Sequence, residues 1–161
     1  METREQILAY LEEVYDPEVP VLSVVDLGIV RKVEIDGVGT HITITPTYTG
    51  CPAMNDIEDD IRSKLKEKGV DHYDIKTILS PAWTTDWISE AGKKKLQDYG
   101  IAPPEKSSPD LSLIGNHKKT IKCPRCHSTD TEMKSFFGST ACKSLYVCNN
   151  CKEPFDYFKC I

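Results

Sequence analysis

The stretch Thr-Tyr-Thr-Gly-Cys-Pro-Ala-Met, residues 47–54, separates an alternating segment before it from an amphipathic segment after it. Gly50 allows a sharp change of backbone direction. Proline is favoured at the first helical position, because the N–H group that it lacks is not needed there. The stretch therefore predicts a strand that turns into a helix, with Cys51 as the N-cap and Pro52 as the first helical residue.

Cys51 is the first candidate functional residue. A thiol at the start of a helix faces free backbone N–H groups and the positive end of the helix dipole, and both favour the thiolate. Such a sulfur is a nucleophile or a soft metal ligand. The alternative is that Cys51 is a small buried apolar side chain, which is a common environment for a free cysteine.

Apolar periodicity predicts the remaining elements up to residue 101, in the order helix, strand, strand, helix, strand, helix. This order indicates an α+β domain, in which a small mixed sheet carries helices on one face. The predicted elements are a helix over residues 4–14, strands over 29–36, 40–48 and 74–79, a helix over 52–68, and a last helix that Thr84 or Thr85 caps and Gly100 ends.

Two further residues near these elements have alternative interpretations. Asp26 lies within an apolar run, where a carboxylate either caps backbone N–H groups in a turn or lines a site, and the turn is the more common role. Trp83 follows the third strand, where it either closes the core or forms a wall of a pocket around Cys51.

Residues 102–116 are rich in Pro and Ser and lack periodicity, so they predict a linker between a domain over 1–101 and a module over 117–161. Residues 1–101 contain 11 Lys and Arg against 19 Asp and Glu, a balance of −8, whereas residues 102–161 contain 9 against 6, a balance of +3. This distribution argues against a nucleic-acid-binding surface.

The C-terminal module contains two Cys-x-x-Cys pairs, Cys123 with Cys126 and Cys148 with Cys151. Two such pairs can supply the four thiolates of a closed tetrahedral Zn²⁺ site, so the sequence predicts a zinc ribbon, although iron fits the same ligands. Such a short segment buries little core, and the metal would supply its folding free energy.

Cys142 and Cys160 remain outside these pairs. They either pack beside the cysteine pairs or serve as alternative ligands or a second thiol site. The polar start of the chain, the absence of a long apolar run and the use of cysteine for metal lead us to expect a cytoplasmic protein without a membrane span.

The motifs over residues 16–20 (DPEVP), 25–30 (VDLGIV), 49–52 (TGCP) and 81–83 (PAW) resemble the small domain of iron–sulfur assembly proteins of the SufT type. This resemblance covers about residues 1–100. With residues 84–88, 99–104 and 153–160 added, the whole chain resembles the family of D components of phenylacetyl-CoA epoxidase systems.

The resemblance implies an accessory protein of aerobic phenylacetate breakdown that is not itself an enzyme. It would help to assemble or maintain the iron or iron–sulfur centre of the oxygenase and reductase components. Cys51 matches the family's reactive cysteine, a transient iron or cluster ligand, and Asp26 matches an acidic position near it. The alternative implied is a structural or docking subunit of the epoxidase complex. Because a cluster takes about four ligands, a homodimer or a client protein would have to complete the shell around Cys51.

Overall fold

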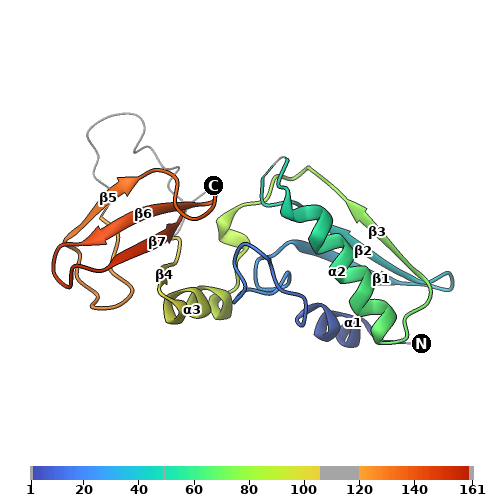
Figure 1. Ribbon diagram of the computed structural model, residues 1–161. Helices are drawn as coiled ribbons and strands as arrows, with labels where there is room; N and C mark the ends of the chain where they lie inside the picture. The colour runs from blue at the N-terminus through green and yellow to red at the C-terminus, as the bar shows by residue number, and fades with distance from the viewer. Residues whose placement is uncertain (1, 49, 106–119, 160–161) are drawn as a thin grey trace. The chain divides into compact units, whose positions relative to one another are not determined.

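The computed structural model describes residues 2–48, 50–105 and 120–159 (Figure 1). Contacts divide the chain into two compact units, Met1–Gly92 and Lys93–Ile161. This division differs from the expected boundary at residue 101. Ile101–Ala102 form strand β4, which pairs with β7 (Pro154–Phe158) of the second unit. Most of the expected linker lies outside the described residues.

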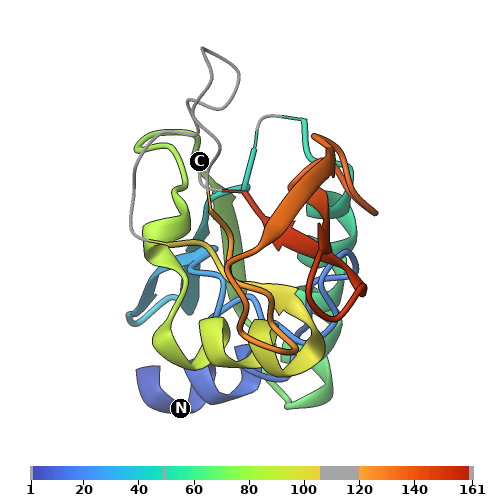
Figure 2. The same ribbon diagram turned by 90° about the vertical axis from the view of Figure 1, so that its left-hand side faces the viewer.

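The sheet of the first unit joins β1 (Val30–Ile35), β2 (Thr40–Ile44) and β3 (Tyr73–Thr77) in that order. β1 and β2 form an antiparallel hairpin and β3 lies parallel to β2, so the sheet is mixed, as predicted. A parallel pair needs a crossover connection, which α2 (Ala53–Glu67) supplies. α2 lies across one face of the sheet (Figures 1 and 2), and α1 (Arg4–Leu11) contacts both α2 and β1.

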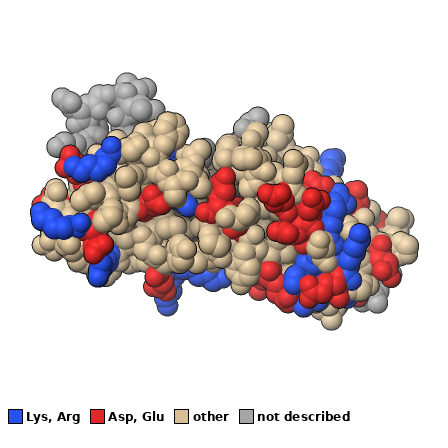
Figure 3. All heavy atoms as spheres, viewed as in Figure 1, with Lys and Arg blue, Asp and Glu red and all other residues tan. Residues whose placement is uncertain are grey.

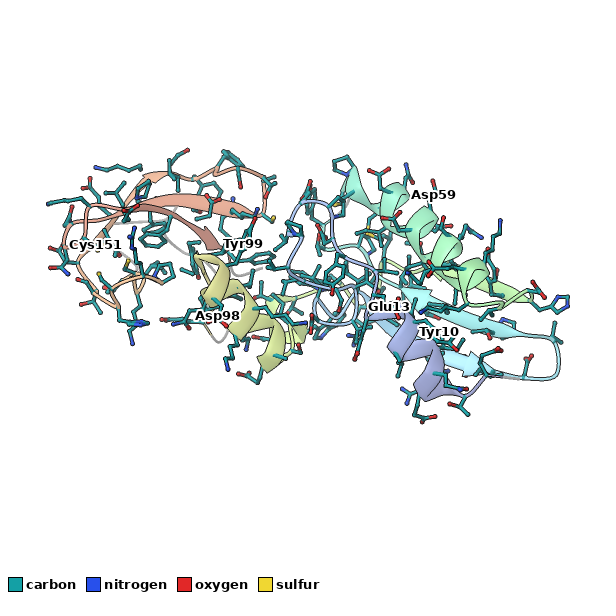
Figure 4. The ribbon with its side chains drawn as sticks, turned by 60° about the horizontal axis from the view of Figure 1, so that its bottom comes forward. Tyr10, Glu13, Asp59, Asp98, Tyr99 and Cys151 are labelled. Atoms are coloured by element: carbon teal, nitrogen blue, oxygen red, sulfur yellow. The ribbon has the colours of Figure 1, made fainter. Side chains whose placement is uncertain are left out.

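α2 packs on the sheet through an apolar stripe with helical spacing. Its fully buried large side chains are Ile57, Ile61 and Leu65. Each such side chain contributes about 1.5–3 kcal/mol through burial. The opposite face is charged, with acidic side chains grouped over the first unit in Figure 3 and Asp59 on the exposed side of α2 in Figure 4.

Two predicted elements are shorter in the structure than in the sequence pattern. α1 ends at Leu11 rather than near residue 14, because the following residues form turns. The Asp16 carboxylate stabilises one of these turns by accepting hydrogen bonds from the backbone N–H groups of Glu18 and Val19, at 2.7 and 3.0 Å. β2 ends at Ile44 rather than at residue 48.

The last predicted helix is two separate elements. Thr84 caps only a short 3₁₀ helix, η1 (Thr85–Trp87), by accepting a hydrogen bond from the backbone N–H of Asp86 at 3.0 Å. α3 (Glu90–Tyr99) begins later, where the Ser89 hydroxyl accepts a hydrogen bond from the backbone N–H of Gly92 at 2.9 Å. The prediction of one continuous helix capped by Thr84 or Thr85 was therefore wrong, and Ser89 was the missed cap.

The turn over residues 23–28 packs against residues 83–89. Trp83, only 4% exposed, donates a hydrogen bond from Nε1 to the carbonyl oxygen of Leu27 at 2.7 Å, so it closes the core. The guanidinium of Arg31 lies 3.4 Å from the centre of the Trp87 ring. Gly28 has φ +71°, and a Cβ atom there would lie 2.5 Å from the carbonyl oxygen of Trp87.

The second unit contains a four-stranded sheet in the order β4, β7, β6 (Lys143–Cys148), β5 (Thr131–Ser135). β5, β6 and β7 are antiparallel neighbours. Aromatic rings form much of its small core, since Tyr146 stacks on Phe155 and meets Tyr157 edge to face, each pair with ring centres 5.8 Å apart. None of the helices in the described ranges combines the length and hydropathy needed to cross a bilayer.

We predict that Gly28→Ala destabilises the first unit by at least about 2 kcal/mol, because the new Cβ atom meets Trp87 and the backbone has a left-handed conformation. Gly37→Ala is the matched control, since a Cβ atom at Gly37 meets nothing within 4 Å. Both tryptophans of the chain, Trp83 and Trp87, lie in the first unit, so urea unfolding followed by tryptophan fluorescence measures the difference. Equal midpoints for the two variants would contradict the prediction.

Candidate metal centre and cysteine site

Four cysteines of the second unit form the one group of potential metal ligands found among the described residues: Cys123, Cys126, Cys148 and Cys151, whose sulfur atoms all lie within 4.8 Å of one another. The closest pairs across the two motifs are Cys123 with Cys151 at 3.8 Å and Cys126 with Cys148 at 3.5 Å. Tetrahedral Zn–S bonds of about 2.3 Å put sulfur atoms about 3.8 Å apart. The four residues predicted from the sequence thus fit a closed metal site; Cys151 is labelled in Figure 4.

The two cysteine turns have the same backbone geometry. In each, the residue after the second cysteine has a left-handed conformation, with φ 62° at His127 and 63° at Lys152. Its backbone N–H donates to the carbonyl oxygen of the first cysteine, from His127 to Cys123 at 3.0 Å and from Lys152 to Cys148 at 2.9 Å. Two matched turns therefore present two sulfur atoms each.

Neighbouring groups shift the pKa values of two of the four thiols, Cys126 and Cys151, in opposite directions. The Asn150 side chain, 3.6 Å from the sulfur of Cys126, and the backbone N–H of Ser128 lower the pKa of Cys126 to about 6. The backbone N–H of Glu153 lowers the pKa of Cys151, but burial and the neighbouring thiols outweigh it and raise that pKa to about 11. Thiols within 4.8 Å of one another disfavour a second negative charge among them. A divalent cation removes this repulsion.

Cys142 is not part of this cluster. It is 5% exposed at the start of β6, whereas Cys148 is the last residue of that strand. Its sulfur lies 2.9 Å from the Thr140 hydroxyl. The structure therefore supports a packing role for Cys142, but not the expected position beside the cysteine pairs. Cys160 lies outside the described residues.

Cys51 lies at the junction of the β2–α2 connection and the helix. Its backbone N–H donates to the carbonyl oxygen of Tyr48, and its own carbonyl oxygen accepts from the backbone N–H of Met54, both at 3.2 Å. Pro52 already has helical dihedral angles and is itself the N-cap, so the prediction that Cys51 is the N-cap was wrong by one residue. The residue is 9% exposed, and its thiol has no hydrogen-bond partner among the described residues.

Asp26 has the turn role that the sequence analysis favoured. Its carboxylate accepts hydrogen bonds from the backbone N–H of Ser23 at 3.3 Å and from the hydroxyl of Ser89 at 3.1 Å. Its backbone N–H donates to the Ser23 hydroxyl at 3.0 Å. Ser89, which sequence reasoning missed, also donates its backbone N–H to the carbonyl oxygen of Asp26 at 2.8 Å. Its only sequence signal was a serine just before a helical pattern.

Several motifs that are distant in the sequence meet in the first unit. The turn that contains Asp26 and Gly28 contacts Trp83, Trp87 and Ser89 through the hydrogen bonds and close packing described above. These contacts unite three of the segments that carry the family resemblance. The contribution of Cys51 and Asp26 to a shared metal site stays a prediction.

Comparison with known proteins gives two family matches that cover different parts of the chain. Residues 4–72 match a model described as an iron–sulfur cluster assembly protein, and residues 107–159 match a model described as a PaaD zinc beta ribbon domain. The fold and the cysteine cluster thus define a class of protein, an iron–sulfur-assembly domain combined with a four-cysteine ribbon.

A relative that matches nearly the whole chain identifies the particular family within this class. The chain is 46% identical over 156 residues to the D component of the Escherichia coli "Putative 1,2-phenylacetyl-CoA epoxidase", covering 97% of this chain and 92% of the relative. It therefore belongs to the family of phenylacetyl-CoA epoxidase D components.

The first part of the chain also has shorter relatives. A Porphyromonas gingivalis protein named "Fe-S protein maturation auxiliary factor" is 39% identical over 98 residues, which cover 60% of this chain and 92% of the relative. The crystal structure of a domain of unknown function from Bacillus anthracis superposes with a TM-score of 0.54 at 30% identity, covering 57% of this chain and 89% of that one.

We predict that the full chain purifies with one Zn²⁺ bound by the four clustered cysteines. Because the metal supplies the folding free energy of so small a core, removing it with a strong chelator unfolds residues 120–159. Amide NMR signals of this segment collapse on chelation and return with added Zn²⁺.

The paired variants Cys126→Ser and Cys142→Ser test the ligand assignment. Cys126→Ser loses the metal or binds it at least about tenfold more weakly, whereas Cys142→Ser retains it, since Cys142 is outside the cluster. Bound iron, detected by visible absorption, would contradict the assignment to zinc, and metal loss in Cys142→Ser would contradict the ligand set.

Proposed function

We propose that this protein is a non-catalytic accessory factor of aerobic phenylacetate breakdown. It helps to assemble or maintain the iron or iron–sulfur centre of the oxygenase and reductase components of phenylacetyl-CoA epoxidase. The observation that carries the proposal is the position of Cys51, at the start of α2 in the domain that matches iron–sulfur assembly proteins. The name of the Porphyromonas gingivalis relative over the same domain, an Fe-S protein maturation auxiliary factor, supports it.

In this proposal Cys51 is a transient ligand for iron or for a cluster, which are the cargo. Sulfur is a soft ligand that suits iron, and Cys51 is buried, with 9% of the residue exposed. Because a cluster takes about four ligands, one cysteine cannot retain it. A second copy of the chain or a client protein supplies the others, and exchange of these ligands passes the cargo to the client.

The surroundings of Cys51 differ from those of a thiol hydrolase. A hydrolytic cysteine needs a base within hydrogen-bond distance, usually a histidine that a third group orients. The Cys51 thiol has no hydrogen-bond partner among the described residues, and the hydrogen bonds that the residue makes with them are those of its backbone. This arrangement supports a binding role for the sulfur rather than acyl transfer.

The ribbon has a different part in the proposal. Its four sulfur atoms form a closed set, so the Zn²⁺ that we assign to it is structural and is not passed on. The six cysteines of the described ranges are all free thiols, which fits a reducing cytoplasm.

A second candidate function is a structural or docking subunit of the epoxidase complex. The name of the Escherichia coli relative, a subunit of the epoxidase, favours it. This function needs stable association with the oxygenase but no reactive cysteine. The two candidates therefore differ in whether Cys51 is required.

We predict that Cys51→Ala lowers the metal content and activity of epoxidase components matured in the same cells at least about tenfold, because the cargo loses its ligand. Iron analysis and turnover of the purified oxygenase and reductase measure this effect. Cys142→Ala is the matched control, since it removes a buried cysteine outside both sites.

Co-purification separates the two candidate functions. The maturation role is supported if the Cys51→Ala protein still associates with the oxygenase but its partner components contain little metal. Fully metallated and active epoxidase from Cys51→Ala cells would exclude the maturation role and leave the docking function.

A further inference from the structure

Strand β3 leaves one edge of the first sheet open. It pairs with β2 on one side and with no other strand of the described residues on its other side (Figure 1). The other three edge strands are protected, because β1 and β5 have irregular registers and β4 has only two residues. Irregular registers and short strands keep sheet edges from pairing with other chains. β3 has neither protection, since its five residues pair with β2 in unbroken register.

The parallel ladder between β2 and β3 decides which backbone groups of β3 point to the open edge. Just before β3, the carbonyl oxygen of His72 accepts a hydrogen bond from the N–H of Thr40 at 2.9 Å. Just after β3, the N–H of Ile78 donates to the carbonyl oxygen of Ile44 at 2.9 Å. Successive residues of a strand direct their backbone groups to opposite sides, so the even-numbered residues face β2. The residues whose N–H and C=O groups face the open edge are therefore Tyr73, Ile75 and Thr77.

The side chains of β3 alternate between the two faces of the sheet. Ile75 lies beside the buried Ile42 in register and is itself partly exposed. Asp74 and Lys76 project from the opposite face and are exposed. Neither of these two charged side chains forms an ion pair with another described residue. The open edge thus has a partly exposed isoleucine between an acidic and a basic residue.

We propose that β3 pairs with β3 of a second copy of this chain, antiparallel and about a two-fold axis at Ile75. In this register Ile75 lies opposite the partner's Ile75, and Asp74 lies opposite the partner's Lys76, twice by symmetry. The outward backbone groups meet as the closely spaced hydrogen-bonded pairs of an antiparallel ladder. Cross-strand pairs of opposite charge stabilise such a ladder. The three strands of each copy then form one continuous sheet.

Charge selects this register over its neighbours. A shift of the two-fold axis by one residue puts Asp74 opposite the partner's Asp74, or Lys76 opposite the partner's Lys76. Like charges that lie directly opposite each other destabilise a strand pair. The axis at Ile75 instead places unlike charges together on both sides of the isoleucine pair. Because the contact uses the same edge of both copies, the assembly closes as a dimer.

The pairing has a consequence for the Cys51 site. The crossover through α2 starts from the carboxyl end of β2, which is the same end of the sheet at which β3 finishes (Figure 1). In an antiparallel pair the two carboxyl ends of β3 lie at opposite ends of the shared ladder, about 17 Å apart over its five residues. The two Cys51 sites thus face different ends of the joined sheet. On the proposed function, a client protein rather than the second copy then completes each ligand shell.

Sedimentation of the zinc-loaded full chain over a range of concentrations measures the pairing, and charge reversal tests its register. Asp74→Lys puts two lysines opposite each other and Lys76→Asp puts two aspartates opposite each other. Each variant alone should therefore dimerise at least about tenfold more weakly than the natural chain. A mixture of the two variants restores both pairs of opposite charge, so it should form a mixed dimer within about threefold of the natural affinity. Asp59→Lys, the same charge change on the exposed side of α2, is the matched control and should dimerise as the natural chain does.

Three results would overturn the inference. The first is a natural chain that stays monomeric up to its highest soluble concentration. The second is a dimer that neither charge reversal weakens, and the third is a pair of weakened variants that do not associate when mixed. Both substituted side chains are exposed, and circular dichroism checks that the variants fold. Because the experiment uses no iron, its result is independent of the Cys51→Ala test of the proposed function.

Discussion

The burial of the apolar stripe of α2 against the three-stranded sheet is the interaction on which the first unit depends. Ile57, Ile61 and Leu65 are inaccessible to solvent, and they face a sheet whose buried side chains include Ile42 and Ile44 of β2. This packing fixes the end of β2 and the start of α2. The connection between them is short, and Cys51 lies near its α2 end.

The second unit depends less on hydrophobic burial than the first unit does. Its aromatic core is small, and four sulfur atoms lie within 4.8 Å of one another at one end of its sheet. Their neighbours lower the pKa of Cys126 and raise the pKa of Cys151. A cation bound by the four sulfur atoms would join two turns that are distant in the sequence. One chain thus combines a domain held by hydrophobic burial with a ribbon whose four cysteines fit a structural metal site.

The sequence predicted much of the fold because most elements have strong local signals. The alternation of β1 and β2, the 3.6-residue period of α2 and the four ligands of the ribbon all follow from residue type and spacing. Element ends were less predictable. α1 stops at Leu11 because the backbone N–H groups of Glu13 and Val14 bond to the carbonyl oxygens of Tyr10 and Leu11 in tight turns, and such turns have no periodic signature.

The sequence by itself indicated the mixed α+β class and the four cysteines that cluster, and it singled out Cys51 as a candidate ligand, because propensity, period and ligand chemistry are local properties. Only the tertiary structure decided that Asp26 joins its turn to Ser89, that Trp83 bonds to Leu27, and that the Thr45 hydroxyl has no partner among the described residues. Whether a polar group is satisfied depends on which distant segments pack around it. That packing is a property of the folded chain, and no single stretch of sequence predicts it.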